Sequence, residues 1–148
     1  MTYRMSQAEA FLCQGIRHLD RVAECKIQDL YRTIGDKDIY QAAMANGVVP
    51  NIAHALSQTV FKGKELPPHW RDAFESTRSR IQAYMDELDS VASALSVSGI
   101  KLVALKNSGI TRAIYPQPGA SPMGDMDVLV SRSDFLAAHG IMSNLGYR

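Results

Sequence analysis

Apolar residues recur at helical spacing through the first hundred residues of the chain. The capping-box pattern of residues 6–9 and the apolar positions after it predict one helix that continues to about Tyr31. Asp36 is the expected N-cap of a second, short helix, which should end at Asn46-Gly47. A third helix is predicted over residues 48–63. The first part of the chain is therefore expected to be entirely helical.

The strongest periodic signal follows the proline-containing linker of residues 64–68. It is a largely apolar stripe with alternating spacings of three and four residues: Trp70, Phe74, Thr77, Ile81, Met85, Leu88, Ala92 and Leu95. Such a stripe marks the side of a helix that packs against other parts of the protein. We interpret it as a core-facing helix and not as a coiled coil or a cofactor-binding face, because helices of the same chain can cover it.

The period of the pattern changes at Gly99. After it, the pattern predicts a buried strand over 100–105, a turn over 106–109 and a short helix over 110–115. Irregular chain over 116–124 leads into a second strand over 125–130. A last helix is predicted to follow the capping box of 131–134 and to end at Gly146. The sequence thus predicts an α+β fold, with a helical segment over 1–98 and an α/β part over 99–148. Two strands are a poor independent sheet, so the helical segment is expected to pack on them.

Composition and charge narrow the class of protein. The chain has 148 residues, of which 46% are apolar, as in one globular domain. Its 16 Lys and Arg nearly balance 15 Asp and Glu, which argues against disorder and disfavours nucleic acid as the main partner. No apolar run is long enough to cross a membrane, and the N-terminal residues do not form a secretory signal. Cys13 and Cys25 are expected to be buried thiols of a cytoplasmic protein.

Asp125 and Asp127 are the most informative candidates for chemistry. Side chains two apart on a strand project from the same face, so both carboxylates should point one way while Met126 and Val128 pack on the other face. Two hard oxygen donors suit Mg²⁺, which is usually shared between one or two carboxylates and substrate phosphates. The alternative is that one aspartate caps the turn after Gly124 and the other is solvated at a strand edge.

Residues 106–109 are the second candidate. A tight turn at the N-terminus of a helix presents free N–H groups and a positive dipole end to a phosphate. Ser108 adds a hydroxyl donor and Lys106 adds a point charge, so Lys106, Asn107 and Ser108 are candidate residues for binding a nucleoside triphosphate. An ordinary strand-to-helix connection is the alternative. A phosphate cradle beside metal-binding carboxylates is what metal-assisted phosphoryl transfer requires.

Three motifs carry a family resemblance: Leu105-Lys106-Asn107-Ser108, Ile114-Tyr115-Pro116, and Pro122-Met123-Gly124-Asp125-Met126-Asp127-Val128-Leu129-Val130. Through them, the chain resembles the uncharacterised bacterial nucleotidyltransferases of the DNA polymerase β superfamily. The resemblance covers about residues 40–148, counting a looser match of the helical part at Asn46-Gly47-Val48 and Leu66-Pro67-Pro68. The specific part of the resemblance is 99–148. It implies that these residues are the opening strands and helices of the mixed sheet of that superfamily.

The resemblance also implies an activity, namely transfer of a nucleoside monophosphate from an NTP to an acceptor hydroxyl with two Mg²⁺ ions. Asp125 and Asp127 would be catalytic and would bind the metals, while Asn107 and Ser108 would hold the triphosphate. The third carboxylate of the superfamily comes from a later strand, so we expect it beyond Arg148. If the natural chain ends at Arg148, we expect no transferase activity from it alone. A second copy or a partner chain could complete the sheet. The acceptor stays open.

Two other interpretations remain. One is a non-catalytic nucleotide-binding or protein-interaction module on the same scaffold, favoured by Asn107 where the family has Gly and by Ser121 where it usually has Arg. The other is a helical regulatory module with an α/β tail, which requires that residues 1–98 fold alone.

Overall fold

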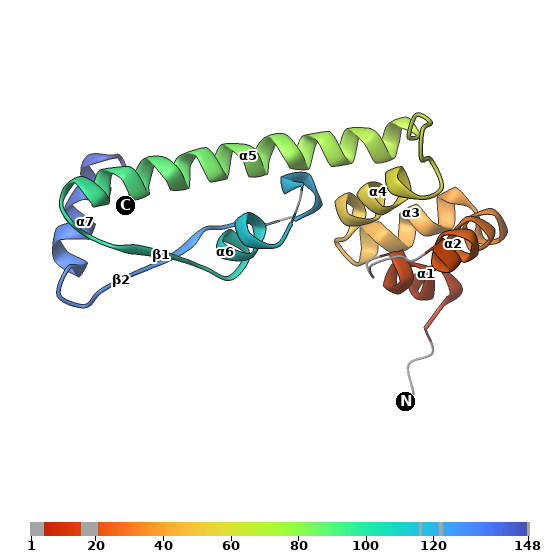
Figure 1. Cartoon of the computed structure of the whole chain (residues 1–148), viewed down its shortest axis with the longest axis horizontal. Coiled ribbons are helices and arrows are strands. Elements are labelled where there is room, and N and C mark those ends of the chain that lie inside the picture. Colours follow the sequence, from red (N-terminus) through yellow and green to blue (C-terminus); the bar gives the residue numbers. More distant parts are fainter. Residues whose placement is uncertain (1–4, 16–20, 116, 122, 148) are drawn as a thin grey trace. The chain divides into compact units, whose positions relative to one another are not determined.

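The computed structural model describes residues 5–15, 21–115, 117–121 and 123–147. Their elements are, in chain order, α1 (Gln7–Gly15), α2 (Arg21–Ile34), α3 (Asp36–Ala45), α4 (Val49–Gln58), α5 (Pro68–Val97), β1 (Leu102–Leu105), α6 (Lys106–Ala113), a 3₁₀ helix η1 (Pro118–Ala120), β2 (Asp127–Val130) and α7 (Phe135–Asn144) (Figure 1). The described chain is mostly helical with an antiparallel pair of strands, which confirms the predicted α+β class.

The chain divides into two compact units, Met1–Arg78 and Ser79–Arg148, called here the first and second unit. The division falls inside helix α5, whereas the change from helical to strand-containing sequence comes at residue 99. The second part of α5 therefore belongs with the strands. No helix of the described residues is long and apolar enough to cross a membrane.

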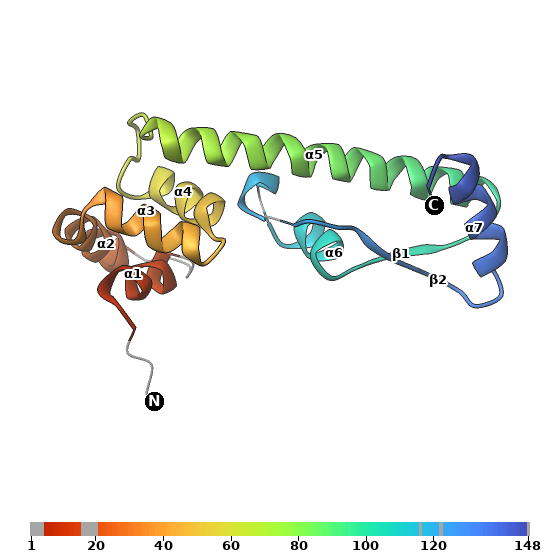
Figure 2. The same cartoon turned by 180° about the vertical axis from the view of Figure 1, so that it is seen from behind.

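The first unit contains helices α1 to α4 and the beginning of α5. Helices α1 and α2 contact each other, both contact α3, and α4 contacts α1 and α3 (Figure 2). Their apolar positions form one buried cluster: Phe11, Leu12, Ile27, Ile39, Ala43, Val49, Ile52, Ala53, Leu56 and Trp70. The core of this unit thus comes from the apolar stripes of five helices.

The single helix predicted up to about Tyr31 is wrong, because α1 and α2 are two helices that pack against each other. The connecting residues 16–20 lie outside the described residues. The predicted capping box is confirmed: the Ser6 amide donates to Glu9 Oε2 at 2.8 Å, and the Glu9 amide donates to Ser6 Oγ at 3.2 Å. The sequence therefore predicted where α1 begins and missed where it ends.

Cys13 is exposed on α1, so the prediction of a buried thiol is wrong there. It follows the buried residues Phe11 and Leu12, and a further step of the helix turns its side chain away from the core. The side chain of Cys25 lies outside the part that the structure describes.

Asp36 is the first residue of α3 and not its N-cap, which is Gly35 with a φ of +91°. Its carboxylate accepts hydrogen bonds from the Tyr31 hydroxyl and, at 2.7 Å, from Trp70 Nε1, and it lies 2.9 Å from His69 Nε2. Burial, together with the Asp36 carboxylate, raises the pKa of Tyr31. Asp36 thus connects α2, α3 and the start of α5 within the first unit.

Glycine ends α3 where the sequence predicted. Asn46 is the C-cap, and Gly47 has a φ of +66°, a conformation that favours glycine. Helix α4 ends at Gln58, earlier than the predicted range of 48–63, and residues 59–64 form turns.

The second unit is built on the antiparallel pairing of β1 with β2, in which Leu102 pairs with Val130 and Leu105 with Asp127. Helix α5 covers one face of this pair (Figure 1). Two clusters form there: Ile81, Met85, Leu88 and Met123 with Leu102, Ala104 and Met126, and Val91, Leu95, Ile100 and Ala138 with Val130 and Met142. The predicted core-facing stripe of α5 is confirmed.

The other face of the strand pair is open. Val103 and Leu129, which pair across the sheet, are each 54% exposed. Strand β1 was predicted to be buried, and this is wrong for alternate residues, because α5 and α7 cover only one face of the sheet in the described part of the chain.

The imidazole of His54 makes the stability of the first unit depend on pH. His54 stacks on Phe74 with ring centroids 5.9 Å apart, and burial lowers the pKa of His54 below its ordinary value of about 6.5. At a pH below about 6.5, His54 is protonated more readily in the unfolded chain than in the folded chain. The free energy of unfolding should therefore fall as the pH drops below 6.5 and through the lower, folded pKa.

We predict that His54→Gln makes this pH dependence shallower below about pH 6.5, where the lower pKa of folded His54 acts. Urea unfolding followed by tryptophan fluorescence measures it, because the single tryptophan, Trp70, is buried in the core of the first unit. His139→Gln, an exposed histidine of the second unit, is the control and should leave the slope unchanged. An unaltered slope in His54→Gln would contradict the assignment.

Candidate active site

The candidate site lies where β1 ends and β2 begins. Because Leu105 pairs with Asp127, the next residue, Lys106, stands beside the start of β2. Lys106 Nζ lies 2.9 Å from Asp127 Oδ2. This hydrogen bond, the charge of Asp127 and, to a smaller extent, the charge of Asp125 raise the pKa of Lys106. The structure thus brings together three of the predicted site residues from two separate segments.

The chain turns from β1 into α6 at a single residue. Lys106 has a φ of +49° and is the only non-glycine residue with a positive φ in the described ranges. Residues 107–109 consequently belong to the first turn of α6, and the separate turn predicted over 106–109 is wrong. A left-handed backbone is unfavourable for lysine, and such conformations are concentrated at functional sites. Lys106 is held in this conformation at the point where its ammonium meets Asp127.

Ser108 joins α6 to both strands. Its buried hydroxyl lies 2.6 Å from the carbonyl oxygen of Leu105 and 3.2 Å from that of Asp127. A serine hydroxyl has one proton to donate, so in this structure it serves the backbone. Asn107 is exposed on the same turn, and the N–H groups of this turn have no acceptor within the helix. A ligand at the first turn of α6 would therefore meet backbone N–H donors, because the Ser108 hydroxyl is already used by the strand carbonyls.

Gly109 allows α6 to lie close to β1. A Cβ atom at this position would be 2.8 Å from the carbonyl oxygen of Ala104, nearer than real Cβ atoms approach. The sequence suggested a glycine for a turn here, whereas the structure requires it for close packing of helix on strand.

Asp125 precedes β2, which begins at Asp127. Asp125 is exposed, and no described residue donates a hydrogen bond to its carboxylate, while the side chain of Asp127 is 35% exposed. Met126 packs in the core beneath α5, so the predicted inward side of this segment is confirmed for Met126. Val128 was predicted to be packed as well, and this is wrong, because it is 38% exposed at the edge of the core.

Asp125 and Asp127 are not part of a larger group of metal-ligating side chains in the described chain. Within the described ranges, no group of three or more His, Cys, Asp and Glu side chains is arranged to hold a metal ion. A metal held here would therefore have to share the two carboxylates with water or with a substrate.

Two side-chain contacts that the sequence did not predict fix α6. Arg112 donates two hydrogen bonds to Asp89 of α5, at 2.6 and 2.7 Å, and this guanidinium lowers the pKa of Asp89. The hydroxyls of Thr111 and Ser121 lie 2.6 Å apart in a buried contact. Nothing in the spacing of these residues links them, because each contact joins distant parts of the chain. They anchor the helix whose first turn faces the acidic pair.

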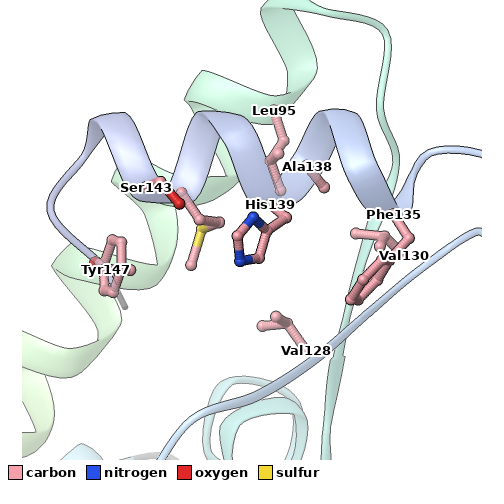
Figure 3. A pocket seen from close by; sticks show the side chains of 9 residues that line it. Leu95, Val128, Val130, Phe135, Ala138, His139, Ser143 and Tyr147 are labelled. Carbon is pink, nitrogen blue, oxygen red and sulfur yellow. The ribbon is translucent and has the colours of Figure 1, made fainter.

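A separate apolar pocket of about 250 Å³ lies between β2, α5 and α7. It is lined by Leu95, Val128, Val130, Phe135, Ala138, His139, Met142, Ser143 and Tyr147 (Figure 3). Asp125, Asp127 and the residues of α6 do not contribute to it. The pocket is therefore distinct from the candidate site.

Comparison with known proteins identifies the class to which this arrangement belongs, that of the nucleotidyltransferases. The chain belongs to the family described as uncharacterised nucleotidyltransferase, whose model matches residues 33–148. This confirms the resemblance seen in the sequence and extends it from residue 40 to residue 33, in the last turn of α2. No curated protein and no solved structure matches the chain.

We predict that Gly109→Ala destabilises the second unit by about 1–3 kcal/mol, because the added methyl group overlaps the Ala104 carbonyl. Gly140→Ala is the matched control: Gly140 is also helical, has open space around it, and should gain about 0.5–1 kcal/mol from the better helix former. Urea unfolding followed by far-UV circular dichroism compares them. Equal effects of the two substitutions would contradict the close approach of α6 to β1.

Proposed function

We propose that this chain transfers a nucleoside monophosphate from an NTP to an acceptor hydroxyl, with release of pyrophosphate and with Mg²⁺ held by Asp125 and Asp127. The observation that carries the proposal is the contact of Lys106 with Asp127 beside the first turn of α6. This contact puts a cation, free helix N–H groups and two carboxylates at one end of the sheet. Membership of a nucleotidyltransferase family supports the same chemistry.

The acidic pair fits a magnesium ion by the chemistry of its donors. Mg²⁺ takes oxygen ligands and commonly uses one or two carboxylates together with substrate phosphates. No described residue donates a hydrogen bond to Asp125, and the 2.9 Å contact with Lys106 engages one oxygen of Asp127. When bound, the metal would stabilise the negative charge that develops on the transferred phosphoryl group.

The chain's own residues would bind and orient the triphosphate. The N-terminus of α6 attracts negative charge, and its N–H groups can donate to phosphate oxygens. The ammonium of Lys106 is a flexible point charge that can leave Asp127 for a phosphate. The side-chain amide of Asn107, exposed on the same turn, can add a donor. Ser108 keeps this turn in place through the two strand carbonyls.

A non-catalytic nucleotide-binding module is the second candidate. Two observations favour it. Within the described residues the site has two carboxylates and no third one beside them. Ser121, which stands where the family usually has Arg, is engaged in a buried contact with Thr111. Such a module would bind nucleotide and release no pyrophosphate in the presence of any acceptor. The helical-module alternative is less favoured, because residues 1–98 alone would expose Ile81, Met85 and Leu88, which pack against the sheet.

We predict that Mg²⁺ with ATP or GTP stabilises the chain against thermal unfolding, by about 2.7 kcal/mol at a ligand concentration near 100 times the dissociation constant. Asp125→Asn combined with Asp127→Asn should abolish the effect, because it removes both anionic ligands. Asp29→Asn combined with Asp38→Asn removes two exposed carboxylates of the first unit and is the control. The absence of a thermal shift at millimolar nucleotide, or a shift that survives the first double variant, would contradict the proposal.

Lys106→Met should change the affinities for metal and for nucleotide in opposite directions. Without the ammonium, no cation competes with Mg²⁺ for the Asp127 carboxylate, so the affinity for Mg²⁺ in the absence of nucleotide should rise a few-fold. The affinity for the Mg²⁺–NTP complex should fall, because a contact with a phosphate is lost. Isothermal titration calorimetry measures both. Lys101→Met, an exposed lysine before β1, is the control and should change neither. Two affinities that move in the same direction would refute the dual role of Lys106.

A further inference from the structure

The apolar pocket between β2, α5 and α7 lies wholly within the second unit, and every residue of its lining belongs to the described part of the chain. Part of the lining is the core itself. Leu95 and Ala138 are 1% and 5% exposed and belong to the cluster that α5 and α7 form with the sheet. Val128 and Val130, two residues apart on β2, contribute from the strand. The pocket is therefore a concave extension of the hydrophobic core, built on three elements that pack against one another.

Three rings belong to the lining: Phe135, His139 and Tyr147. The rings of Phe135 and His139 have centroids 6.4 Å apart, and Figure 3 shows both on the side of α7 that faces Val128. Tyr147 is tied to α5, because its hydroxyl donates to Glu87 Oε1 at 2.5 Å. Aromatic rings attract a further ring by their faces and edges, beyond the gain from burying its area. This lining therefore favours a flat aromatic ligand over an aliphatic one.

Two side chains give the apolar pocket a capacity for hydrogen bonding. His139 and Ser143 are four residues apart on α7, so they lie on the same side of the helix. The imidazole and the hydroxyl can each donate or accept a hydrogen bond. Both residues are exposed, which puts them at the open side of the pocket. Mostly apolar walls with a few polar groups are typical of sites that bind and orient small molecules.

The volume of the pocket limits the size of its ligand. It measures about 250 Å³, whereas a cavity of about 150 Å³ is enough for a benzene molecule. Sites for larger organic ligands usually measure about 300–1,000 Å³. The pocket thus has room for one substituted aromatic ring and is too small for a nucleotide or an extended peptide.

We propose that this pocket binds a small aromatic molecule that carries one hydrogen-bonding substituent. The ring would lie against Val128, Phe135 and Met142, whose thioether sulfur makes favourable contacts with aromatic rings. The substituent would meet His139 and Ser143 at the open side. Asp125, Asp127 and the residues of α6 do not line this pocket, so the proposal does not depend on the transfer reaction.

The test is a nuclear magnetic resonance titration of the ¹⁵N-labelled full chain with 4-methylphenol, toluene and cyclohexanol. We expect saturable shifts of the amide signals of residues 128–130 and 138–147. 4-Methylphenol should bind several-fold more tightly than toluene, which lacks the hydroxyl, and than cyclohexanol, which lacks the aromatic ring. Shifts that do not saturate, or cyclohexanol and 4-methylphenol of equal affinity, would overturn the proposal.

Ser143→Leu places a larger apolar side chain in the lining from an exposed position, so it should raise the dissociation constant of 4-methylphenol about tenfold or more. Ala137→Leu adds a leucine at an exposed position of α7 outside the lining and should leave this constant unchanged. The amide spectrum of each variant shows whether it is folded. Equal effects of the two leucine variants would contradict the assignment.

His139→Phe keeps a ring in the lining and removes a hydrogen-bonding group, so it should reduce the preference for 4-methylphenol over toluene. An unchanged preference in His139→Phe combined with Ser143→Ala would refute the polar end of the site. Shifts at the same residues that grow with protein concentration in the absence of any probe would show that a second copy of the chain fills the pocket, which would also overturn the proposal.

Discussion

The antiparallel pairing of Leu105 with Asp127 is the constraint on which the candidate site depends. It sets the last residue of β1 opposite the first residue of β2, so that the next residue, Lys106, reaches the Asp127 carboxylate. Ser108 reinforces the pairing, because its hydroxyl lies within hydrogen-bond distance of a carbonyl on each strand. A shift of one residue in this register would turn the side chains to the opposite face and separate the charges.

Two short strands do not form a stable sheet alone, and the second part of α5 provides the missing core. Its buried residues Ile81, Met85 and Leu88 cover the inner face, and the Arg112–Asp89 pair ties α6 to the same helix. The site is therefore supported by a helix that the sequence groups with the helical segment. This explains why the compact units divide inside α5 and not at the first strand.

The sequence predicted the features that repeat or that follow local rules. The α5 stripe, the end of α3 at Asn46-Gly47 and the inward side of Met126 all come from short-range patterns. It could not predict features that depend on distant contacts. The left-handed conformation of Lys106 and the use of Ser108 by two strand carbonyls arise only when β1 meets β2. The contacts that α1 and α2 make with each other and with α3 likewise join separate parts of the chain.

We propose that the acidic pair and the first turn of α6 form one site for metal and triphosphate. Nuclear magnetic resonance of the full chain with Mn²⁺ in place of Mg²⁺ tests it directly, because the paramagnetic ion broadens the signals of nearby amides. In the presence of NTP, selective broadening at residues 125–127 and 106–108 is expected, and it should disappear in the Asp125→Asn, Asp127→Asn variant. Broadening centred elsewhere, or broadening unchanged in that variant, would contradict the account.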